Sequence, residues 1–369
     1  MNEVIQVKAL SHHYPLVIGA AVHRDVAFWL QQAKLRDDTS IFIITDENVG
    51  KTGYPQALKA LLEGAGYRAT MAVVSAGDAS KSLETAQQLY RSMLQVQIRR
   101  NDVVMAVGGG MVGDLAGFVA ATYLRGLRFV QVPTTLLAHD SSIGGKVGVN
   151  LAEGKNLVGA FHQPILVLYD TEILSTLPQR EWTGGLAELI KHGLIGNPEL
   201  FADLAKNPCP TFPGPDRTTE LVADAARVKI GIIEEDERES GIRMVLNVGH
   251  TVGHAIEQES GYTIHHGEAV AMGLAVESEL SFQKGWLSQD DRDQIFAILC
   301  NHGLPNGKPD LRIESVLETM NLDKKHEHAA WTFALPYGIG DVRIVRGITK
   351  DEVVSAWDAT PTWKAGQGR

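Results

Sequence analysis

The sequence predicts an α/β N-terminal domain with a Rossmann-like parallel sheet, followed by a mostly α-helical C-terminal domain. Two observations support this prediction. Short apolar runs alternate with helix-length segments in the first half of the chain, which is typical of βαβ units and a parallel sheet. After residue 178 these runs give way to helical periodicity. We therefore expect one domain at residues 1–178 and a second at 179–369 of the 369-residue chain.

Buried strands are expected where apolar and β-branched residues run without interruption. They lie at residues 41–45, 70–74, 102–107, 129–132 and 166–169. Helices are expected between them at 51–64 and 82–97. In a parallel sheet, ligands bind beyond the carboxyl ends of the strands. Asp46, Gly108–Gly110 and Thr134–Thr135 fall at such ends.

The second domain carries helical periodicity with one weak pair of strand-like runs. Helices are expected at residues 182–195, 218–234, 249–259, 267–284 and 290–301, and the strand pair at 331–335 and 342–345. The proline-rich stretch 208–215 predicts a rigid loop between two helices and not a domain linker.

Composition excludes several classes of protein. The net charge of −10, from 34 basic and 44 acidic residues, argues against general nucleic-acid binding. Cys209 and Cys300 are the only cysteines, too few for a disulfide framework or a cysteine zinc site, and they indicate a reducing cytoplasm. The N-terminus lacks the pattern of a signal peptide, and no apolar run reaches the roughly 18 residues of a membrane span.

Histidines gather between residues 246 and 268. His250 and His254 are four residues apart and share one face of a helix. His265 and His266 follow closely, and neutral imidazoles grouped in this way are typical zinc ligands. The alternative is a set of surface or capping histidines.

Two glycine-rich segments in the first half have the composition of anion sites. Gly108–Asp114 follows a strand and precedes a helix, so its backbone N–H groups could face a pyrophosphate. Its spacing is not GxGxxG, and a tight turn without a ligand is the alternative. Asp140–Lys146 with Gly154–Asn156 has the composition of a phosphate cradle. A solvated surface loop is the alternative there.

Charged side chains at the start of the second half suggest further site residues. Glu188 could complete a His/His/Glu metal set or form an ordinary ion pair with Lys191. The spacing does not exclude His192 as a ligand. Glu239 and Arg243 belong to a charged run that leads into the histidine segment, and such runs are usually solvated faces.

Several ordered motifs resemble the 3-dehydroquinate synthase family over nearly the whole chain. They include GGGMVGDLAGF, YLRGLRFVQVPTTLLAHDSSIGGKVGVN, GGLAELIKHG, DERESGIRMVLNVGHTVGHAIE and HHGEAVAMG. The resemblance implies a phosphate-eliminating lyase of the shikimate pathway that uses NAD and a divalent metal. It would convert 3-deoxy-D-arabino-heptulosonate 7-phosphate to 3-dehydroquinate by transient oxidation, β-elimination of phosphate, re-reduction and aldol closure.

The resemblance also implies site residues. Zn²⁺ or Co²⁺ would be held by Glu188, His250 and His266, which leaves out His192 and makes His265 the spare imidazole. NAD would contact Asp46, Asn48, Asp78, Lys81, Gly109, Gly110, Asp114, Thr134, Thr135, Lys155, Asn156, Thr176, Leu177 and Glu181. The substrate would contact Asp140, Lys146, Asn156, Lys191, Lys229, Glu239, Arg243, Asn247 and His254, with Arg125 from a partner subunit and one of Lys324 and Lys325.

A cytoplasmic homodimer is expected from the same resemblance, without nucleic-acid or membrane partners. The nearest rival is a related cyclase acting on a non-carboxylated sugar phosphate. The ESGIRMVLN context of Arg243 and Asn247 matches the dehydroquinate type instead. A metal-dependent polyol dehydrogenase is a second alternative, and the DSSIGGK and GKN motifs of this chain argue against it. A non-enzymatic NAD-binding or scaffold protein is a third, and it would be expected to lack metal or cradle residues, all of which this chain keeps.

Overall fold

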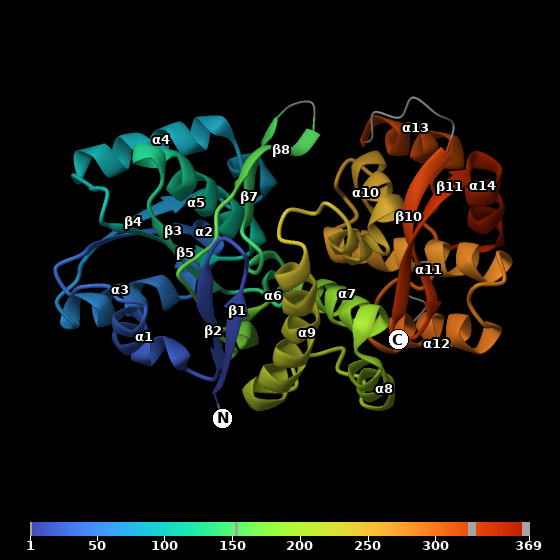
Figure 1. Cartoon of the computed structure of the whole chain (residues 1–369), viewed down its shortest axis with the longest axis horizontal. Helices are drawn as coiled ribbons and strands as arrows, with labels where there is room; N and C mark the ends of the chain where they lie inside the picture. The colour runs from blue at the N-terminus through green and yellow to red at the C-terminus, as the bar shows by residue number, and fades with distance from the viewer. Residues whose placement is uncertain (1, 152–153, 324–329, 364–369) are drawn as a thin grey trace. The chain divides into compact units, whose positions relative to one another are not determined.

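The computed structural model describes residues 2–151, 154–323 and 330–363, and the chain folds into two compact units (Figure 1). The first comprises Met1–Leu177 with Pro213–Glu237, and the second comprises Pro178–Phe212 with Arg238–Arg369. Lys324 and Lys325 lie outside the described residues. Among the helices that are described, none combines the length and apolar character of a membrane span.

A seven-stranded sheet forms the centre of the first unit, in the order β1-β2-β9-β6-β5-β3-β4. All neighbouring strands are parallel except β1 and β2, which pair antiparallel. The strands are β1 (Glu3–Lys8), β2 (His13–Gly19), β3 (Ser40–Asp46), β4 (Arg68–Val74), β5 (Val103–Gly108), β6 (Arg128–Pro133) and β9 (Leu166–Asp170). The parallel sheet predicted from the sequence is therefore confirmed, and β1 and β2 extend it beyond the five predicted strands.

Helices cover both faces of this sheet, with α4 and α5 on one face and α1 and α3 on the other (Figure 1). The helix expected at 51–64 begins at Tyr54 instead, because Gly53 adopts φ +78° as its N-cap and Pro55 lies in its first turn, while Lys51 ends the separate short helix α2. The helices are α1 (Val26–Gln32), α2 (Glu47–Lys51), α3 (Tyr54–Gly64), α4 (Leu83–Gln95), α5 (Gly110–Thr122), α6 (Ala138–Ser141) and α9 (Pro215–Glu235), with 3-10 turns η1 (Val22–Asp25), η2 (Asp78–Ser80), η3 (Tyr123–Arg125) and η4 (Ile173–Thr176).

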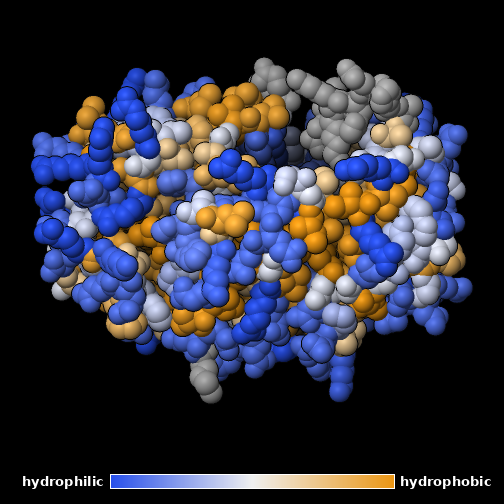
Figure 2. All heavy atoms as spheres, viewed as in Figure 1, coloured by the Kyte–Doolittle hydropathy of each residue, from blue (hydrophilic) through white to orange (hydrophobic). Residues whose placement is uncertain are grey.

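A β-hairpin occupies much of the glycine-rich segment after Asp140, for which the sequence predicts no strand. Strands β7 (Lys146–Leu151) and β8 (Gly154–Phe161) pair antiparallel. Glycines allow this close approach, since a Cβ on Gly148 would lie 2.8 Å from the Val158 oxygen. Hydrophobic side chains remain exposed on β8, and one of the hydrophobic patches in Figure 2 lies over this strand. The glycines therefore serve strand pairing as well as any ligand.

The second unit is mostly helical, as the sequence predicts. Helix α11 is buried along most of its length and contacts α7, α10, α12 and α14. The elements are α7 (Gln179–Gly196), α8 (Pro198–Lys206), η5 (Ile242–Asn247), α10 (His250–Glu259), α11 (His266–Gln283), α12 (Gln289–Asn301), α13 (Ile313–Asp323), β10 (Ala330–Gly338), β11 (Asp341–Thr349) and α14 (Lys350–Ala359). Strands β10 and β11 form the expected antiparallel pair.

Helix α9 packs in the first unit, although the sequence predicts it within the second domain. Its buried face contacts β1 and β2, and Thr219 bonds Thr171 at 3.0 Å. The chain passes from the second unit to the first at Phe212/Pro213. The proline-rich stretch therefore joins the two units, and the prediction that it is not a linker is wrong.

Candidate active site

Two imidazoles and one carboxylate meet in the second unit. The Oε1 atom of Glu188 lies 3.4 Å from Nε2 of His250 and 3.4 Å from Nε2 of His266. One ligand atom from each of the three residues lies within 4.8 Å of the others. Two nitrogens and one oxygen match the donor set of an open catalytic zinc site, which keeps a position for substrate.

The three helices that carry these side chains approach closely because glycines line their contacts. Glu188 lies one turn after Gly184 on α7, and His266 starts α11 beside Gly267. A Cβ on Gly267 would lie 2.1 Å from the Gly184 oxygen. Farther along α11, a Cβ on Gly273 would lie 1.9 Å from the oxygen of Gly249, which precedes α10.

The charges of the three side chains are set by their surroundings. Burial raises the pKa of Glu188, but Lys191 and the two imidazoles outweigh it and hold that pKa well below its usual value. Burial and the Lys191 ammonium lower the pKa of His250. Burial also lowers the pKa of His266, yet its bonds to Glu188 and Glu257 prevail and raise it to about 9. At neutral pH Glu188 is therefore a carboxylate and His250 a neutral imidazole, the forms that coordinate a metal. His266 carries a second ring proton at this pH, which binding of a metal would release.

The remaining histidines of this region have different surroundings. His192 is fully buried and lies outside the three-residue group. The ring of His254 is solvent-exposed, with its centre 5.1 Å from that of His250 and 5.8 Å from that of His266. His265 is exposed and lies 3.5 Å from Glu181, which is exposed as well.

Four further residues expected at the site lie in the second unit. Lys191 is 1% exposed and forms an ion pair with Glu188, so the ion pair given as one alternative is present, and Glu188 also belongs to the group of three potential ligands. Arg243, in η5, is 2% exposed. The amide of Asn247 donates to Oε1 of Glu239 at 3.1 Å. The charged run of the sequence is thus partly buried here and is not wholly a solvated face.

In the first unit, polar groups gather at the carboxyl ends of β3, β5 and β6. Asp46 accepts backbone N–H bonds from Asn48 (2.7 Å) and Val49 (3.1 Å), so it caps α2. Helix α5 begins at Gly110, and a Cβ on Gly109 would lie 2.9 Å from Thr135 Cγ2. The buried hydroxyl of Thr134 has no hydrogen-bond partner in the part of the chain that is described.

A polar network joins the η2 turn, α5 and the β7–β8 hairpin. The ammonium of Lys81 donates to Asp114 at 2.5 Å and also to the side chain of Asn156. Burial raises the pKa of Asp114, and Lys81 opposes this in part. Lys155 forms an ion pair with the exposed Asp78. Five side chains for which the resemblance implies contact with NAD therefore lie on neighbouring elements.

The remaining residues expected at the site in this unit lie on or next to α6, α9, β7, η3 and η4. Lys229 of α9 donates to the Asp140 carbonyl at 2.5 Å and lies 3.0 Å from its Oδ2. Lys146 is exposed at the start of β7. Arg125 is exposed, and it and Leu124 both adopt positive φ. Thr176 and Leu177 lie at the end of η4 and just beyond it.

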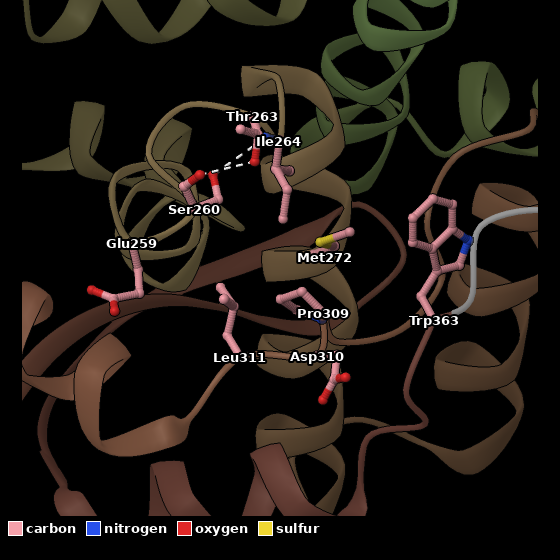
Figure 3. Close-up of a pocket in the computed structure, with 9 residues that line it drawn as sticks. All are labelled: Glu259, Ser260, Thr263, Ile264, Met272, Pro309, Asp310, Leu311 and Trp363. Atoms are coloured by element: carbon pink, nitrogen blue, oxygen red, sulfur yellow. Dashed lines mark hydrogen bonds between the residues drawn. The ribbon is translucent and has the colours of Figure 1, made fainter.

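Two acidic residues near the histidines have no role in the sequence analysis. Glu257 accepts from Nδ1 of His266 at 3.1 Å, and Glu277 accepts from the N-terminal amides of α10. In sequence both resemble ordinary helical acids, although Glu257 lies within the histidine-rich segment. A separate hollow of about 400 Å³ between α10, α11 and the 309–311 segment is lined by other residues, including Glu259 and Met272 (Figure 3). None of the three potential metal ligands lines this hollow.

The comparisons with known proteins agree over nearly the whole chain. Family models described as 3-dehydroquinate synthase N-terminal and C-terminal match residues 71–184 and 185–326. A 3-dehydroquinate synthase of Desulforamulus reducens is 41% identical over 95% of this chain and 98% of its own length. One from Synechococcus is 40% identical over 96% of this chain and 99% of its own.

Solved structures share the fold. A 2-epi-5-epi-valiolone synthase of Streptomyces hygroscopicus, with NAD⁺ and Zn²⁺ bound, has a TM-score of 0.85 at 27% identity and covers 96% of this chain and 98% of its own. A 2-deoxy-scyllo-inosose synthase complexed with carbaglucose-6-phosphate, NAD⁺ and Co²⁺ has a TM-score of 0.85 at 23% identity, covering 97% of this chain and 100% of its own.

Proposed function

This chain belongs to the 3-dehydroquinate synthase family, and we propose which of its residues bind the metal, NAD and the substrate. The chain is a phosphate-eliminating lyase of the shikimate pathway. It converts 3-deoxy-D-arabino-heptulosonate 7-phosphate to 3-dehydroquinate and phosphate. The convergence of Glu188, His250 and His266 from three helices is the structural observation that carries the assignment of residues.

Glu188, His250 and His266 hold Zn²⁺ or Co²⁺ in this proposal. The fit rests on the donor set, because two imidazole nitrogens and a carboxylate suit either ion. The low pKa of Glu188 supports the same role, since a ligand carboxylate must be ionised. When bound, the metal polarises a coordinated hydroxyl, and NAD accepts and returns the hydride.

NAD binds at the carboxyl ends of the strands in the first unit. Support comes from the glycine start of α5, where the helix N-terminus favours a pyrophosphate, and from the buried Thr134 hydroxyl described above. The proposed contacts in this unit are Asp46, Asn48, Asp78, Lys81, Gly109, Gly110, Asp114, Thr134, Thr135, Lys155, Asn156, Thr176 and Leu177. Glu181, which belongs to the second unit, is a further proposed contact. Lys81 and Asp114 would fix the hairpin beside the cofactor.

The substrate carries a carboxylate and a phosphate, so its binding residues should be largely cationic. Lys146, Lys191, Lys229 and Arg243 supply four positive charges. Asp140, Asn156, Glu239, Asn247 and His254 complete the proposed set. Lys229 holds Asp140 by an ion pair, which supports an orienting role for both side chains. Much of the rate enhancement would come from positioning.

The proposal extends to the assembly and compartment. The protein is a cytoplasmic homodimer in which Arg125 enters the partner's site. The exposure of Arg125 supports this role, and the count of two cysteines suits a reducing compartment.

Phosphate release from the heptulosonate phosphate by metal-loaded protein tests the function, with NADH absorbance followed in parallel. Phosphate release without net NADH is the expected result, because the hydride returns to the substrate. Net NADH would indicate a polyol dehydrogenase. If NAD-bound, metallated protein releases no phosphate, the result would favour the activity of a related cyclase that acts on a non-carboxylated sugar phosphate.

A further inference from the structure

We propose that Glu257 and Glu277, two buried carboxylates outside the proposed metal ligands, are positioning residues that fix the two histidines for coordination. This inference rests on the metal site of the proposed function. Neither acid is among the residues proposed to contact the metal, NAD or the substrate. Each acid acts on a different histidine, and each does so through bonds that the structure records.

Glu257 acts on His266 directly. Its Oε2 lies 3.1 Å from Nδ1 of the imidazole, while Nε2 of the same ring faces Glu188 at 3.4 Å. A carboxylate on Nδ1 fixes the tautomer that keeps the Nε2 lone pair for a metal, and it orients the ring. Glu257 is 8% exposed, so its carboxylate is largely shielded from water, whereas the His266 ring is 31% exposed.

Glu277 acts on His250 through the backbone. Its two oxygens accept N–H bonds from Gly249 at 2.5 Å and from Val252 at 3.2 Å. These amides lie at the start of α10, whose first residue is His250. The N-cap, Gly249, has no side chain to satisfy them. A carboxylate from α11 therefore takes the place of the missing cap and fixes the backbone of His250.

The burial of Glu277 shows how closely these groups must fit. Its side chain is 0% exposed, and burial of a carboxylate is strongly unfavourable unless its oxygens are bonded. The positive end of the α10 dipole offsets part of that cost. With Nδ1 of His250 beside the Val248 carbonyl at 3.1 Å, Nε2 is directed to Glu188. A neutral side chain at 277 would loosen this arrangement.

Titration of the metal-free protein with Co²⁺, read by affinity and by the visible absorption of the bound ion, tests the inference. Glu257→Gln and Glu277→Gln should each weaken Co²⁺ binding by about 10- to 100-fold and change the absorption spectrum. Glu259→Gln and Glu279→Gln are the matched controls. Glu259 lies on α10 but is exposed at the hollow of Figure 3, and Glu279 is a buried acid of α11 that bonds Arg292.

The outcomes separate the inference from the proposed function. If the parent protein takes up no Co²⁺, the metal assignment itself fails. If the parent binds Co²⁺ and the two variants match it in affinity and spectrum, the positioning roles are overturned. An equal loss in Glu279→Gln would overturn the role of Glu277. If Glu277→Gln does not fold, Glu257→Gln still tests positioning with the α10 cap intact.

Discussion

Gly267 of α11 packs against Gly184 of α7 so closely that a Cβ at position 267 would lie 2.1 Å from the Gly184 carbonyl oxygen. The two backbones touch without side chains between them. Because Glu188 and His266 lie within a turn of this contact, their side chains can meet although 78 positions separate them in the chain, from 188 to 266. The glycines of GGLAEL and HHGE thus determine the distance between two proposed ligands.

Gly267→Ala should separate α7 from α11, because the carbonyl it would meet is backbone and cannot rotate away. We expect a loss of about 1–3 kcal/mol in the free energy of unfolding and weaker Co²⁺ binding. Gly231→Ala in α9 is the control, since its Cβ meets nothing within 4 Å and should stabilise by up to about 1 kcal/mol. Denaturant unfolding measures both, and parental stability in Gly267→Ala would contradict the packing argument.

His250→Ala should abolish stoichiometric metal binding and turnover, because it removes a proposed ligand. The far-UV circular dichroism should stay unchanged, because the substitution removes no large side chain from the core. Metal content by elemental analysis is the measurement. His265→Ala is the control, because His265 is exposed and lies outside the group. If His250→Ala keeps its activity and its full zinc content, His250 is not a metal ligand.

Lys146→Ala should weaken binding of the heptulosonate phosphate much more than binding of NAD. Loss of a charge-assisted hydrogen bond costs about 1.5–3 kcal/mol, roughly a 10- to 100-fold rise in KM. Lys155→Ala on the same hairpin should show the reverse, since Lys155 pairs with Asp78 on the proposed NAD side. Calorimetry with NAD and steady-state kinetics separate the two effects. Equal losses of affinity for NAD and for the heptulosonate phosphate would mean that Lys146 does not contact the substrate specifically.

Local sequence patterns predict the central strands because each is an uninterrupted apolar run. They do not predict β7 and β8, whose glycines and polar residues resemble a loop until the pairing of Gly148 with Gly159 is known. The same limit applies to the site. His250 and His254 share a helix face by spacing alone, whereas the cap that Glu277 gives to α10 joins groups 25 and 28 positions apart. Such contacts depend on tertiary packing.

Glu268 links two of the ligand-bearing helices in a pH-dependent way. Its oxygens accept from Nε and Nη2 of Arg180 at 2.7 and 2.6 Å, and from the His265 N–H at 3.0 Å. Burial raises the pKa of Glu268, but the bonds from Arg180 outweigh it and keep that pKa below its usual value. The bridge therefore stabilises the fold above the unfolded pKa of about 4.3, and this contribution is lost as pH falls through the lower folded pKa.

Glu268→Gln should accordingly lower the free energy of unfolding at neutral pH by about 1 kcal/mol, a modest value because Arg180 is half exposed. The deficit should shrink as pH falls below about 4, where the parent carboxylate itself becomes protonated. Denaturant unfolding of both proteins across this range is the measurement. Glu63→Gln removes an exposed helical pair with Lys59 and should cost at most about 0.5 kcal/mol. A deficit in Glu268→Gln that stays constant into acid would mean that its charge does not hold α7 to α11.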